Sequence, residues 1–107
     1  MSVETEKLIG QGTTPTLRLR YRWTESATNT LLFSLRQSGK TIISKTEADA
    51  RWMDERILFT FTQAETLQLT PGPCYLQLRA RLNNGTVLML NGKDPLTVVE
   101  AFEKRVI

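Results

Sequence analysis

The sequence predicts an all-β fold, an immunoglobulin-like antiparallel β-sandwich of about seven strands with one short helical turn. Apolar and polar residues alternate with a period of two almost throughout the 107 residues. Turn-forming residues separate these runs at short intervals. The longest run, residues 75–82, follows a proline-rich turn and returns through Asn83-Asn84-Gly85, which is typical of the F–G hairpin of such a sandwich.

The first half of the chain supplies three strands. Residues 17–23 alternate apolar side chains with arginines, which predicts a strand with one buried face. A second strand is expected over 31–36, and the turn Ser38-Gly39-Lys40 leads into a third over 41–44. The chain is long enough for one domain only, in which residues 1–12 form an extended arm or an edge strand.

The polar segment 47–55 is weakly patterned, which indicates a loop or a short helical turn. We expect Trp52 and Met53 to hold it against the core. A strand follows over 57–62. Thr62 and Glu65 have the spacing of a capping box, so a helical turn begins there and crosses between the sheets.

A tyrosine corner is predicted at the start of the long strand over residues 75–82. Tyr75 stands at the start of the long strand, where its hydroxyl is expected to reach backbone a few residues upstream. The return strand covers 87–90 and, after a break at 92–95, continues over 96–99.

Composition argues against an enzyme. The chain has no histidine, the usual general base and the commonest metal ligand. Its single cysteine, Cys74, lies in an apolar run and is expected to be a small buried hydrophobe. Asp49, Asp54 and Asp94 lack a recognisable metal-binding spacing. We therefore expect no catalytic residue, no metal and no cofactor.

Arginines give the only candidate anion-binding face. Lysine and arginine number 14 against 11 acidic residues, a formal charge of +3. The candidate residues are Arg18, Arg20, Arg22, Arg79 and Arg81. They would suit nucleic acid or a saccharide. The alternative is a solvated sheet face, which we favour because Tyr21 and Trp23 alternate inward and leave no outward stacking platform.

Apolar residues suggest a subunit interface. Leu32, Leu58, Leu88 and Leu90 fall on faces that the alternation assigns outward, or on strands buried on both sides. Leu88 and Leu90 are the candidate contact residues, because the last strand is an edge strand that only Lys93 guards.

No apolar run approaches the roughly 18 residues that span a bilayer. The N-terminal residues are polar and lack the pattern of a signal peptide. We therefore expect no membrane association.

Three motifs occur in a characteristic order: Gly12-Thr13-Thr14-Pro15-Thr16, the segment 58–67, and Gln77-Leu78-Arg79 followed by Gly85. Together they resemble a group of small prophage-encoded structural proteins, mostly from Gram-positive hosts. These are similar in turn to the β-sandwich N-terminal domain of phage upper-baseplate proteins. The resemblance covers roughly residues 9–107, with Phe61 and Ala64 as departures from the usual Leu and Glu.

This resemblance implies a non-enzymatic virion component of a tail, baseplate or capsid-associated structure. Its partners would be other phage structural proteins and copies of itself, so we expect a homo-oligomer. It would reside in the virion, or in the host cytoplasm during assembly.

Overall fold

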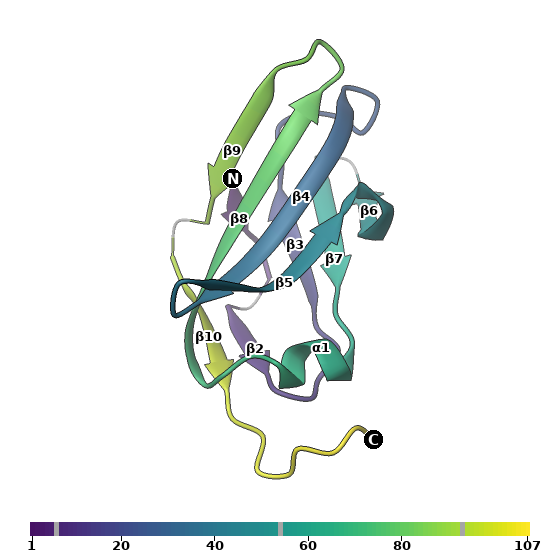
Figure 1. The fold of residues 1–107 in the computed structure, drawn as a ribbon. Helices are drawn as coiled ribbons and strands as arrows, with labels where there is room; N and C mark the ends of the chain where they lie inside the picture. The colour runs from purple at the N-terminus through teal and green to yellow at the C-terminus, as the bar shows by residue number, and fades with distance from the viewer. Residues whose placement is uncertain (6, 54, 93) are drawn as a thin grey trace.

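The computed structural model contains two β-sheets packed face to face (Figure 1). It describes residues 1–5, 7–53, 55–92 and 94–107. The expectations that involved Asp54 and Lys93 therefore lie outside the described residues. All strand pairs described are antiparallel except β2 with β10.

The strand order confirms the immunoglobulin-like sandwich. The small sheet has the order β1 (Ser2–Val3), β3 (Thr16–Arg20), β7 (Arg56–Thr60), β6 (Ala50–Met53). The large sheet has the order β2 (Leu8–Gly10), β10 (Leu96–Val99), β8 (Gly72–Leu82), β4 (Thr28–Gln37), β5 (Lys40–Thr46), and β9 (Val87–Asn91) also pairs with β8. With β9 and β10 together in the place of strand G, and β2 as an additional edge strand, these are the orders A-B-E-D and G-F-C-C′ of immunoglobulin-like domains.

The core lies between the sheets and is built from alternate residues of each strand. Leu17 and Leu19 of β3 face Phe33 and Leu35 of β4, and all four are at most 1% exposed. The Phe33 ring lies 4.6 Å from that of Phe59, centroid to centroid. Because successive strand residues point to opposite faces, this inward set leaves the arginines outside.

The first residues of the chain contribute an edge strand to each sheet. β1 pairs antiparallel with β3, and β2 pairs in parallel with β10. The last strand is likewise divided into β9 and β10. The structure consequently has ten strands among the described residues rather than about seven.

Segment 47–55 agrees with its prediction only in part. A short 3₁₀ helix (Glu47–Asp49) is capped by Thr46, and the edge strand β6 follows it. Trp52 packs against the core as expected, but Met53 is 52% exposed. The sequence missed β6 because an edge strand with no fully buried residue shows no strong alternation.

The capping box at Thr62 is confirmed. Helix α1 (Gln63–Leu67) begins after Thr62, whose backbone N–H donates to Glu65 Oε1 at 2.9 Å. The Glu65 N–H donates to Thr62 Oγ1 at 3.1 Å. The buried Thr66 hydroxyl donates to the Thr13 carbonyl at 2.9 Å, which fixes α1 across the end of the sandwich.

The predicted tyrosine corner is wrong. Tyr75 lies on β8 between Cys74 and Leu76, which both face the core, so its own ring faces outward and is 56% exposed. The buried tyrosine is Tyr21, at 1% exposure, and its hydroxyl lies 2.9 Å from Thr28 Oγ1. Tyr75 therefore lies on the same outward face of β8 as Arg79 and Arg81.

Candidate functional site

The arginines of β3 lie on the outer face of the small sheet. Arg18 and Arg20 are exposed there, while Leu17 and Leu19 point into the core. Arg22 follows the end of β3, and its guanidinium carbon lies 5.3 Å from the centre of the Trp23 ring. Arg22 therefore stacks on a neighbouring aromatic side chain.

Glu4 partly neutralises this face. Its Oε2 accepts a hydrogen bond from Arg56 Nε at 2.9 Å and lies 3.7 Å from Arg18 Nε. The hydrogen bond from Arg56 lowers the pKa of the Glu4 carboxyl, against a smaller opposing effect of burial. Glu4 consequently stays ionised, and an external anion has to compete with it for these guanidinium groups.

The sheet adds two arginines that the sequence pattern did not single out. Arg56 pairs with Arg20 in the β3–β7 ladder, and Arg51 lies beyond Leu58 in the next row of the same face. Strand pairing places them together, although 31 or more positions separate each of them from the β3 arginines in the chain. The alternation of residues within one strand does not reveal which residues of another strand will lie beside it.

The predicted five-arginine face does not form. Arg79 and Arg81 lie on β8, whose outward face belongs to the large sheet. The outer faces of two packed sheets point away from each other. Arg79 and Arg81 therefore cannot extend the Arg18–Arg20 row into one patch.

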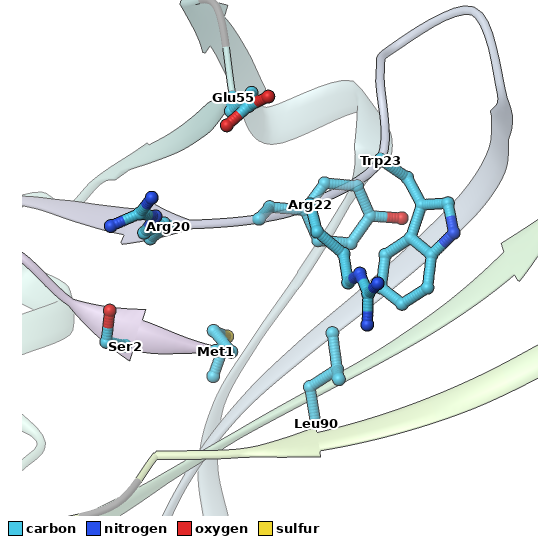
Figure 2. A pocket seen from close by; sticks show the side chains of 8 residues that line it. Met1, Ser2, Arg20, Arg22, Trp23, Glu55 and Leu90 are labelled. Atoms are coloured by element: carbon cyan, nitrogen blue, oxygen red, sulfur yellow. The ribbon is translucent and has the colours of Figure 1, made fainter.

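A crevice of about 330 Å³ opens where β3, β1 and β9 approach the same edge of the sandwich. Figure 2 shows Met1 and Leu90 on one side of it and Trp23 on the other, with the Arg22 guanidinium between Leu90 and the indole. Arg20 also lines the crevice. It combines an apolar interior with cationic groups, but no described feature specifies an occupant.

The predicted interface leucines point inward. On β9, Leu88 lies opposite the buried Ala80 and Leu90 lies opposite the buried Leu78. Leu90 packs against the core cluster. Their assignment to the outer surface is therefore wrong.

The outward apolar residues of β9 are Val87 and Met89, which are 57% and 60% exposed. They lie opposite Arg81 and Arg79 on β8. Leu32 of β4 extends the same outer face and lies opposite Arg79 on the other side of β8. The outer apolar surface of β9 is therefore formed by Val87 and Met89, each next in the chain to a leucine that was predicted to lie there.

Cys74 is fully buried, as predicted, and burial raises the pKa of its thiol to about 11. In the part of the chain that the structure describes, histidine, cysteine and carboxylate side chains form no group of three that could hold a metal ion. Within the same residues, no helix has the length and apolar character needed to cross a membrane.

The sequence matches no family model and no curated protein. The structure is similar to the crystal structure of CopC from Methylosinus trichosporium OB3b, with a TM-score of 0.53 and 13% sequence identity. The match covers 92% of this chain and 87% of that chain. At this identity the similarity concerns the fold alone, and it supports the β-sandwich architecture.

Proposed function

We propose that this protein is a non-enzymatic structural module of a phage or prophage particle, located in the virion or in the host cytoplasm during assembly. It associates with copies of itself and with other phage structural proteins in a tail, baseplate or capsid-associated structure. The association with phage rests on the three sequence motifs that resemble prophage-encoded structural proteins. The main structural support for an assembly role is that β9 is an exposed edge strand.

Two features of β9 favour pairing with a second strand. Among the described residues β9 pairs with β8 alone, so its other edge presents backbone N–H and C=O groups. Val87 and Met89 add exposed apolar surface on the outer side of that edge. Two copies can pair antiparallel across a two-fold axis at Met89, which places Val87 of each copy opposite Asn91 of its partner.

The chemistry of the chain supports the absence of catalysis. Histidine is missing, and Cys74 is buried with a thiol pKa of about 11, so a thiolate nucleophile is strongly disfavoured at neutral pH. The alternative, binding of nucleic acid or a saccharide through the arginines, has less support. The five predicted arginines are divided between two outer faces, and Glu4 pairs with Arg18.

Light scattering at tens of micromolar tests the assembly role. We expect the wild-type protein to form a dimer or a larger ring, and Met89→Lys to shift it toward the monomer by placing a charge in the edge contact. Ser44→Lys is the matched control, since it adds the same charge on β5, the opposite edge strand of the same sheet. A wild-type protein that is monomeric throughout this range contradicts the proposal.

Leu88→Lys and Leu90→Lys are unsuitable for the same test. Both side chains lie on the inner side of β9, so a lysine there disturbs packing as well as association. Loss of the oligomer in these variants would not separate unfolding from a broken contact.

A further inference from the structure

We propose that the outer face of the large sheet binds a neutral saccharide chain, with Tyr75 as its stacking platform. A groove of about 660 Å³ crosses this face over β5, β4, β8 and β9. It is separate from the arginine row of the small sheet and from the crevice in Figure 2. The inference does not depend on the phage context.

Two neighbouring cross-strand rows build the floor of the groove. In the first row Asn91 pairs with Gln77, and Gln77 with Ser34, one residue from each of three strands that line the groove. With about 4.8 Å between adjacent strands, this row is about 10 Å long. It presents amide and hydroxyl groups at regular intervals.

The second row lies about 7 Å from the first, two residues further along β8 and β4. It contains Tyr75 of β8, Arg36 of β4 and Thr41 of β5, which are paired in that order and are all exposed. An aromatic ring and a guanidinium group therefore stand side by side, next to a row of amides and hydroxyls.

Tyr75 supplies the apolar contact that a sugar ring requires. Its ring is 56% exposed, although the residues on either side of it are fully or almost fully buried. Sugars present a C–H face that packs on an aromatic ring, while the phenolic hydroxyl remains available to hydrogen-bond. A large aromatic side chain among amide, hydroxyl and guanidinium groups fits this kind of ligand.

The polar groups around Tyr75 are held in place. Gln77 Nε2 donates to Asn91 Oδ1 at 3.0 Å, and each amide carries a second polar atom that can serve a hydroxyl group. Arg36 Nη2 donates to the Gly39 carbonyl at 3.1 Å, which orients the guanidinium at the rim. Ser38 and Gly39 form that rim as a tight turn with positive φ angles of 50° and 76°.

The charge of the groove distinguishes a saccharide from a nucleic acid. Arg36 is the one charged side chain among its described lining residues. Nucleic-acid sites need several cations along the phosphate backbone. A neutral chain of hydroxyl-bearing rings matches one guanidinium, two amides, several hydroxyls and one aromatic ring.

An NMR titration of the ¹⁵N-labelled protein tests the inference. The probes are neutral hexasaccharides of glucose, N-acetylglucosamine, mannose and galactose, together with an oligothymidine of similar length. We expect at least one hexasaccharide to shift the amide resonances of β4, β8 and β9 around the groove. Tyr75→Ala should weaken that binding by about tenfold or more, and Tyr75→Phe should preserve it.

Met89→Ala is the matched control, because Met89 is equally exposed on the same sheet face but does not line the groove. Asn91→Ala provides a second groove variant, expected to weaken binding even if Tyr75→Ala fails to fold. The inference is overturned if no hexasaccharide shifts these resonances, if only the oligothymidine does, or if neither groove variant weakens binding.

Discussion

Replacing Glu65 with glutamine tests how strongly an ion pair beneath α1 stabilises the sandwich. Lys45 points inward from β5, with its ammonium nitrogen 2.8 Å from Glu65 Oε2 and 5.0 Å from the centre of the Phe61 ring. The two side chains are only 10% and 27% exposed. Glu65→Gln leaves the lysine charge in place without its counter-charge.

Glutamine at this position separates the ion pair from the helix cap. A capping box accepts either glutamate or glutamine three residues after the N-cap, so Thr62 retains its partner in the variant. The loss is therefore assigned to the ion pair. Breaking a fully buried pair costs about 3–5 kcal/mol and an exposed pair about 0.2–1 kcal/mol. Because this pair is partly exposed, we expect the free energy of unfolding to fall by about 1–3 kcal/mol.

Urea unfolding at pH 7 measures the change. With an m-value of about 1–2 kcal/mol/M, the midpoint should fall by about 0.5–2 M. Lys7→Gln is the matched control, because Lys7 Nζ also lies 2.8 Å from its partner, Asp94, but these side chains are 48% and 64% exposed. The control should change the free energy of unfolding by no more than about 0.5 kcal/mol. A Glu65→Gln shift no larger than that of the control would refute the reasoning.

The same variant has a defined pH dependence. Burial raises the pKa of Glu65, but the hydrogen bonds from Lys45 and from the Thr62 backbone outweigh it, so the net pKa is lowered. A lowered pKa in the folded state stabilises the protein above the pKa of the unfolded chain, and this contribution is lost as pH falls through the folded value. The difference between wild type and Glu65→Gln should therefore be largest at neutral pH and shrink in acid.

Two further substitutions and one labelling experiment test which side chains are buried. Tyr21→Phe removes the hydroxyl that lies 2.9 Å from Thr28 Oγ1 and should lower the free energy of unfolding by about 0.5–1.5 kcal/mol. Tyr75→Phe should leave the urea midpoint unchanged, since that ring faces solvent. A large shift would instead indicate that the Tyr75 hydroxyl makes the buried hydrogen bond of a tyrosine corner. Cys74 should react with a disulfide reagent at pH 8 only in urea, because its thiol is buried with a pKa of about 11, and rapid labelling of the native protein would contradict this.

Local patterns determined the fold class and several turns. The alternation in residues 17–23 correctly predicted the buried face of β3. The spacing of Thr62 and Glu65 correctly predicted the start of α1, and Ser38-Gly39 correctly predicted the turn between β4 and β5. These features depend on residues that are close in the chain, so a single sequence contains the whole signal.

Alternation failed where its phase was uncertain. On β9 the phase was wrong: Leu88 and Leu90 were assigned outward and lie on the inner face. On β8 the phase was correct for Arg79 and Arg81, and the tyrosine-corner assignment of Tyr75 went against it. Because a strand repeats every two residues, a phase error of one residue reverses every assignment along it. In apolar runs such as Val87–Leu90 the sequence offers no polar residue that fixes the phase.

The tertiary structure alone decided which distant side chains meet. Gln37 faces inward from β4 and donates to the Thr70 carbonyl at 2.8 Å, while its Oε1 accepts from the Thr70 N–H at 2.9 Å. Gln11 similarly donates to the Leu69 carbonyl at 2.6 Å and holds the same crossover. The Arg18–Glu4–Arg56 contact and the groove around Tyr75 also join residues from separate strands. Strand register sets these contacts, and register is fixed by packing between the sheets rather than by neighbours in the chain.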